Sequence, residues 1–152
     1  MGSSPFSSVE SPPATVSAPP ACPAEAAKYF EWAGFNSDGS YGFDAMRPGW
    51  GKPIHQMLVV NHVTAVFHGH DHFYARQELD GIAYQLVPQP SHPGTTVNQA
   101  TEYSYREGVF LPPAGHIRVA VAGTGVKVEY VSASLNGNSN RSVSHSYTLV
   151  QR

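Results

Sequence analysis

The sequence has few of the features that indicate a disulfide framework, a nucleic-acid partner or a membrane. It contains one cysteine, Cys22, which excludes an internal disulfide. Only 13% of the residues are charged and the net charge is -2, so the basic footprint of a nucleic-acid-binding protein is missing. No apolar run approaches the roughly 18 residues that a membrane span needs. We therefore expect neither nucleic acid nor a membrane as a partner.

Residues 1–23 lack lysine, arginine and any periodic apolar pattern. They are mostly Ser, Pro and Ala, and such a segment cannot bury enough apolar surface to offset its ordering entropy. We expect residues 1–23 to be a disordered leader. Residues 24–152 contain the sequence expected to fold, and this length suffices for one domain with a sizeable core.

Helical patterns are confined to the first part of this region. Residues 24–35 contain a short helical stretch that Gly34 would end. A second helix is expected to begin at Pro53, whose fixed φ suits a first helical turn, and to end at Asn61 or His62. Its apolar positions follow the i, i+3, i+4 spacing of one helix face: Ile54, Met57 and Leu58.

Strand and turn patterns dominate after this helix. Val63–Phe67 is a short apolar, β-branched run, which predicts a strand buried on both faces. Asp80-Gly81 separates two alternating runs and predicts a hairpin, and residues 123–125 predict a second one. Residues 142–150 form a last expected strand. Residues 88–114 are rich in Pro, Ser and Gly and predict a long irregular loop.

The most informative stretch is Phe67–Phe73, "FHGHDHF", which directly follows the expected strand. Imidazole is a good ligand for zinc, iron or manganese, and His70 and His72 on one turn can both point into one cavity. Gly69 would allow the backbone to bend sharply there. In α/β sheets the carboxyl ends of strands are where ligand sites are built. The pattern therefore indicates a metal site at the end of this strand.

Spacing separates the families that use short histidine clusters. An H-E-x-x-H zinc helix is excluded because no Glu lies between the histidines. The H-x-H-x-D-H pattern of metallo-β-lactamase-like hydrolases does not fit either, since the stretch His68–His72 is one residue too short to place the Asp. The third pattern is G-H-x-H after a buried strand, and Gly69–His72 matches it.

With its surroundings, this motif resembles the C-terminal part of the calcineurin-like metallophosphoesterases. The similarity runs from about Ala24 to the end of the chain. It implies an α/β fold, with the C-terminal part of a β-sandwich flanked by helices and mostly β after residue 63. It also implies that 24–152 is a partial metallophosphoesterase domain, a metal-dependent phosphoester hydrolase. The resemblance assigns His70 and His72 as ligands of two Zn, Mn or Fe ions that act on a phosphoester substrate.

The sequence also departs from this family. The family's upstream motifs are D-x-H, G-D-x-x-D and G-N-H-[DE], and none of them occurs here. We therefore expect an incomplete centre that lacks its N-terminal half, with weak metal binding and little or no catalysis by the isolated chain. The alternative is a noncatalytic β-rich module that has lost the chemistry.

Three further residues near the motif are weaker candidates for the site. Asp71 is expected to be exposed and to orient a neighbouring histidine as a hydrogen-bond acceptor. His68 is expected mainly to end the strand. His92, in the long loop, approaches the site only if that loop folds back over it.

The other singled-out residues are expected to be structural. His55 and His62 would lie on the surface and at the end of the second helix, and His116 and His145 would alternate on strands. Arg76 is expected to form a surface ion pair rather than to meet phosphate.

Overall fold

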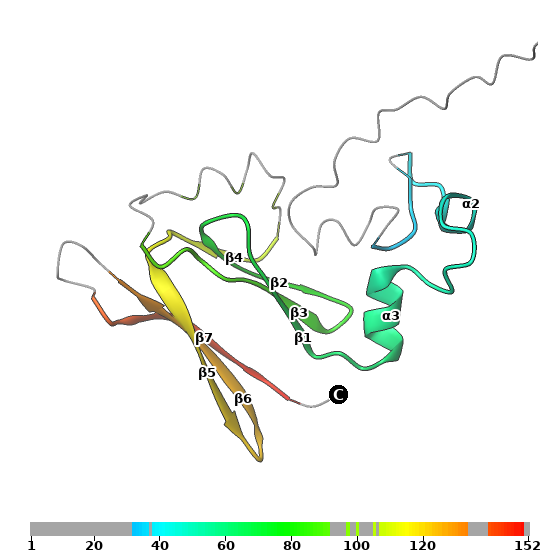
Figure 1. Cartoon of the computed structure of the whole chain (residues 1–152). Helices are drawn as coiled ribbons and strands as arrows, with labels where there is room; N and C mark the ends of the chain where they lie inside the picture. The colour runs from blue at the N-terminus through cyan, green and yellow to red at the C-terminus, as the bar shows by residue number, and fades with distance from the viewer. Residues whose placement is uncertain are drawn as a thin grey trace, which may run out of the picture.

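Figure 1 shows the fold in a computed structural model of the chain. The structure describes residues 32–36, 38–91, 97, 100, 105, 107–133 and 140–150. The leader expected at residues 1–23 lies outside them, as does most of the helix expected over 24–35. Of that stretch, Trp32–Phe35 are described, and they form a turn and an isolated bridge to Tyr41.

Two short helices precede the strands: α2 (Phe43–Met46) and α3 (Ile54–Val60). The helix expected from Pro53 is confirmed as α3. Pro53 is its N-cap, with φ of -58°, and Asn61 is its C-cap. His62 then adopts a positive φ of 54°, which turns the chain from the helix toward the first strand.

The buried face of α3 differs from the predicted stripe. Leu58 packs against the main core cluster as expected, but Met57 is 42% exposed. Val59 packs there in its place, together with His55, which is buried. His55 was expected on the helix surface, and that prediction is wrong because the imidazole finds polar partners on the sheet beneath the helix.

The first sheet has four strands in the order β1-β3-β2-β4. The strands are β1 (Ala65–His68), β2 (Tyr74–Leu79), β3 (Ile82–Leu86) and β4 (Val109–Leu111). β1 is parallel to β3, whereas β2 is antiparallel to both β3 and β4. The predicted hairpin at Asp80-Gly81 is confirmed, with φ of 49° and 73° at these two residues, the positive values that a type I′ turn requires.

The second sheet has three antiparallel strands in the order β5-β6-β7. They are β5 (Gly115–Ala122), β6 (Gly125–Ser132) and β7 (Val143–Leu149). The second hairpin and the last strand are therefore where the sequence predicts them. Figure 1 shows the β5–β6 hairpin extending away from the first sheet, and Val119 and Val121 on β5 are 46% and 78% exposed.

Two predictions about this region are wrong. The first is burial of the initial strand on both faces, since Phe67 on β1 is 45% exposed. β1 is the edge strand of the described sheet. Phe67 pairs with Gln85 and shares its face, and the second sheet covers Gln85 but leaves Phe67 partly uncovered. The second is the uninterrupted loop over 88–114, because β4 lies within it and Ala100 has a helical backbone.

Alternate residues of β3 point to opposite faces of the first sheet and connect it to two layers. Tyr84 faces α3, where it hydrogen-bonds His55 at 2.6 Å. Its neighbour Gln85 faces the second sheet, where its Oε1 accepts the Tyr147 hydroxyl at 2.9 Å. The described residues are thus mostly β, with two sheets in contact that do not close into a barrel and with α3 on the far face of the first (Figure 1).

The contact between the sheets is made by aromatic side chains with polar ends. Tyr74 of β2 is fully buried and stacks on Tyr130 of β6, with ring centroids 4.6 Å apart. Its hydroxyl also lies 2.7 Å from Nδ1 of His145 on β7. Burial, and then the nearby charge of Arg76, lowers the pKa of His145. The structural role expected for His145 is confirmed.

Arg76 lies in the same contact and pairs as the sequence predicts. Its guanidinium forms an ion pair with Glu78 at 2.5 Å and lies 5.1 Å from the ring centroid of Tyr147. Such a cation–π contact is worth about 0.5–2 kcal/mol, depending on how far the cation is desolvated. The side chain therefore joins the sheets and belongs to the fold.

Candidate metal site

The histidine turn lies directly after β1, as predicted, at the carboxyl end of that strand. Two backbone hydrogen bonds join it to the chain that leaves β3. The amide of Val87 donates to the carbonyl of His68 at 2.8 Å, and the amide of Gln89 donates to that of His72 at 3.0 Å. The backbone on both sides of the turn is therefore fixed by the neighbouring strand.

The two predicted ligands, His70 and His72, are both exposed. The sharp bend in the turn falls at His70, whose φ is +100°. Only glycine adopts such values without strain, and a side chain there costs about 1–3 kcal/mol. Gly69 does not have a positive φ, and a Cβ added to it would meet nothing within 4 Å. The flexibility expected of Gly69 is thus not what bends the chain.

Asp71, between these histidines, is 2% exposed. The expectation that it is exposed is wrong. Its Oδ2 accepts the hydroxyl of Tyr105 at 2.8 Å, and its Oδ1 has no hydrogen-bond partner in the described part of the chain. Its burial follows from Tyr105, a partner 34 residues away that no local pattern reveals.

His68 and His92 complete the predicted set. His68 is the last residue of β1 and is half-buried. Burial lowers the pKa of His68 to about 4, although a backbone hydrogen bond with Gly69 and the charge of Asp71 act in the opposite direction. Its imidazole is therefore neutral at pH 7. His92 lies outside the described residues.

The donor set decides which metal chemistry these residues fit. Exposed imidazoles on one turn suit zinc, iron or manganese. Within the described ranges, however, His, Cys, Asp and Glu do not form any group of three that could hold an ion. Even catalytic zinc sites usually have three protein ligands. His70 and His72 therefore fit a part of a metal centre that needs further ligands from elsewhere.

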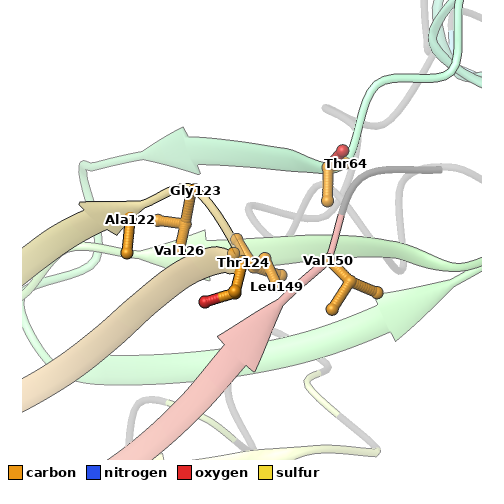
Figure 2. A pocket seen from close by; sticks show the side chains of 8 residues that line it. Thr64, Ala122, Gly123, Thr124, Val126, Leu149 and Val150 are labelled. Atoms are coloured by element: carbon orange, nitrogen blue, oxygen red, sulfur yellow. The ribbon is translucent and has the colours of Figure 1, made fainter.

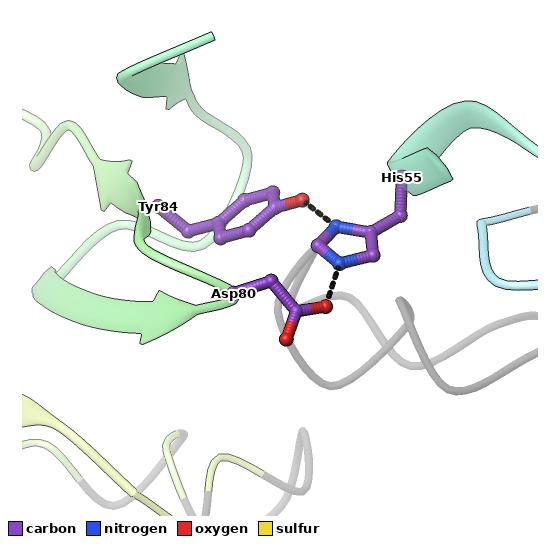
Figure 3. Close-up of polar contacts among 3 residues, drawn as sticks. All are labelled: His55, Asp80 and Tyr84. Carbon is purple, nitrogen blue, oxygen red and sulfur yellow. Dashed lines mark hydrogen bonds and ion pairs between the residues drawn. The ribbon is translucent and has the colours of Figure 1, made fainter. Parts of the chain in front are cut away.

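Figure 3 shows a second polar cluster, formed by His55, Tyr84 and Asp80. Nδ1 of His55 lies 2.6 Å from the Tyr84 hydroxyl, and Nε2 lies 2.8 Å from Oδ2 of Asp80. A carboxylate only accepts, so Nε2 of His55 donates to Asp80. A hydroxyl, an imidazole and a carboxylate in this order also occur in catalytic triads. Tyr84 is only 1% exposed, which keeps substrate away, so the cluster fastens α3 to the β2–β3 hairpin.

A cavity of about 300 Å³ lies near the start of β1 (Figure 2). Its lining is uncharged and comes from three segments: the residue before β1, the β5–β6 turn and the end of β7. The lining residues are Thr64, Ala122, Gly123, Thr124, Gly125, Val126, Leu149 and Val150. Thr64 precedes β1, whereas the histidine turn follows it. The cavity offers no charged group to an anion and is separate from the histidine turn.

No protein-family model matches the chain, and no curated protein matches it. The resemblance to the metallophosphoesterases thus rests on the residues quoted above. Within the described residues, no helix has the length and apolar character needed to cross a membrane.

The strain at His70 gives a first testable prediction. Replacing His70 by glycine should stabilise the chain by up to about 1 kcal/mol, since the positive φ no longer carries a Cβ. His70→Ala removes the same imidazole but keeps the strain, so it should not stabilise. Urea unfolding of both variants measures the difference. Equal stability of the two variants would mean that the backbone at position 70 is relaxed in the native state.

Proposed function

We propose that this chain contributes His70 and His72 to the dinuclear metal centre of a metal-dependent phosphoester hydrolase of the calcineurin-like metallophosphoesterase type. The observation that carries the proposal is the histidine turn itself. It has the G-H-x-H sequence, follows a strand, and presents both imidazoles at the surface in a backbone conformation that costs free energy. Strain of this kind is retained where function requires it.

The arrangement of layers supports the same proposal. A helix packs on one face of the first sheet through Leu58 and Val59, and a second sheet packs on the other face through Tyr74 and Tyr147. This order of layers is compatible with the C-terminal part of an α/β sandwich flanked by helices. The histidine turn lies at the end of the edge strand β1, where an adjoining part of a larger site has room to approach.

The role of the chain's own residues follows from their chemistry. His70 and His72 would each bind one cation through a ring nitrogen. Bound cations neutralise charge that develops on a phosphoryl group and make water a better nucleophile. In this family the upstream motifs supply the bridging carboxylate and the group that holds phosphate. None of these motifs occurs in this sequence. We propose that they belong to a separate N-terminal half of the domain.

Zinc binding and hydrolysis by the purified 152-residue chain test this function. We expect weak, substoichiometric zinc binding that a His70→Ala, His72→Ala double variant loses, because two ligands leave a cation underligated. Hydrolysis of p-nitrophenyl phosphate and its bis-ester should stay near background with zinc, manganese or iron. Isothermal titration and initial-rate assays measure the two quantities.

Two controls make this test specific. A His62→Ala, His116→Ala double variant removes two exposed histidines outside the turn and should bind zinc as the parent chain does. If it loses binding equally, the ions are held at scattered surface histidines. No zinc binding by the parent chain would favour the noncatalytic β-rich module. Ordinary enzymatic turnover by the isolated chain would show that its site is complete.

A further inference from the structure

Asp71, in the middle of the histidine turn, is buried without full hydrogen bonding of its side chain within the part of the chain that the structure describes. It is a carboxylate that is 98% buried, with one oxygen bonded to Tyr105 and the other, Oδ1, left without a partner among the described residues. Leaving a buried polar atom without a hydrogen bond costs at least as much free energy as one ordinary hydrogen bond contributes. Fold stability alone would favour an apolar residue at this position.

Tyr105 is held firmly enough to act as the anchor of this carboxylate. Its ring packs edge-on against Phe73 at 5.0 Å and against Phe110 at 5.6 Å between centroids. Both Tyr105 and Phe73 belong to the main core cluster. The hydroxyl is thus fixed by the core of the first sheet, and the carboxylate that accepts from it is fixed in turn.

The side chain of Asp71 points the opposite way from those of its two neighbours in the chain. Asp71 is buried in the core while His70 and His72, directly before and after it, are exposed. Its side chain is therefore directed away from the solvent that the two imidazoles share. Asp71 does not complete a group of three candidate ligands with them, so its influence on a bound ion passes through the backbone.

From this arrangement we propose that Tyr105 and Asp71 form a buried pair that positions His70 and His72 for metal binding. The pair pins the middle of the turn to the core, which holds His70 at its strained φ of +100° and keeps both imidazoles directed outward. It deepens the proposed function and rests on it. Tyr105 is a positioning residue here, because it touches neither metal nor substrate.

The test compares two tyrosine hydroxyls in the full chain. Tyr105→Phe removes the hydroxyl that holds Asp71. Tyr130→Phe is the matched control, because Tyr130 is 2% exposed and its hydroxyl likewise donates one hydrogen bond, to the Pro112 carbonyl at 2.7 Å. Zinc affinity is measured by competition with a chromophoric chelator. Amide hydrogen exchange is followed at Gln89, which donates to the His72 carbonyl and so reports on the turn without metal.

The expected result is a split between the variants. Tyr105→Phe should weaken zinc binding about 10–100-fold, the range typical of partners that orient ligands, and should speed exchange at Gln89 about three- to tenfold, as for one lost hydrogen bond. Tyr130→Phe should change neither. Parent-like zinc affinity in Tyr105→Phe, or an equal loss in both variants, would overturn the proposal.

Failure of the proposed function gives a different result. If the parent chain binds no zinc, the metal centre is wrong, and the exchange data alone decide whether the pair positions the turn. Faster exchange at Gln89 in Tyr105→Phe only would then support the pair as an anchor of the turn. Unchanged exchange would refute it.

Discussion

Replacing Tyr74 by alanine is expected to destabilise the protein by about 3–5 kcal/mol, the usual cost of truncating a buried aromatic residue. Tyr74 is fully buried where the sheets meet, stacked on Tyr130 and bonded to His145. The total stability of a domain is only about 5–15 kcal/mol, so this one change should remove a large share of it. Urea unfolding followed by circular dichroism measures the loss.

The control for this prediction is Tyr74→Phe, which keeps the stacked ring and removes the hydroxyl. It should cost about 0.5–1.5 kcal/mol, the net value of one hydrogen bond. A loss in Tyr74→Phe as large as that in Tyr74→Ala would assign the stability to the bond with His145. A small loss in both would mean that the sheets hold together without this contact.

His55→Ala is expected to cost about 2–4 kcal/mol, from the cavity it leaves and from the loss of its hydrogen bond with the buried Tyr84 hydroxyl. In a Tyr84→Phe background the same change should cost about 0.5–1.5 kcal/mol less, because the hydrogen bond between the two side chains is already gone. Chemical unfolding of the four proteins of this double-mutant cycle gives the coupling.

Asp80→Asn separates the two ends of the same cluster. The Asp80 side chain is 63% exposed, and exposed ion pairs contribute about 0–1 kcal/mol. Asparagine also tolerates the positive φ at this position. This variant should therefore stay within about 1 kcal/mol of the parent chain. If the losses of stability in His55→Ala and Tyr84→Phe are simply additive, the hydrogen bond between these residues does not help to fasten α3 to the β2–β3 hairpin.

The features predicted correctly from the sequence are those that neighbouring residues determine. Asp80-Gly81 specifies its turn through the positive φ of two adjacent residues, and Pro53 marks a helix start by its own ring geometry. The candidate site follows the same rule, since the position of Gly69–His72 after a strand could be deduced from a short apolar run.

The features that were predicted wrongly depend on contacts with residues far away in the sequence. His55 is buried because Tyr84, 29 residues later, meets its ring, and Asp71 is buried because of Tyr105. A histidine on a helix and an aspartate in a turn are ordinarily solvated, so local patterns predict exposure for both. Phe67 fails in the opposite sense, since the side chains of an apolar strand are buried only where another layer packs on their face of the sheet.

The β5 strand has a consequence for the protein in solution. It is the edge of the described second sheet, and its exposed Val119 and Val121 lie beside backbone groups that another strand can pair with. Edges of this kind recruit strands from other molecules unless a charge or proline interrupts them. Arg118 is the one charged residue within β5, and Ala120–Ala122 beyond it carry no such gatekeeper. We therefore expect this edge of the hairpin to favour association between copies of the chain at high protein concentration.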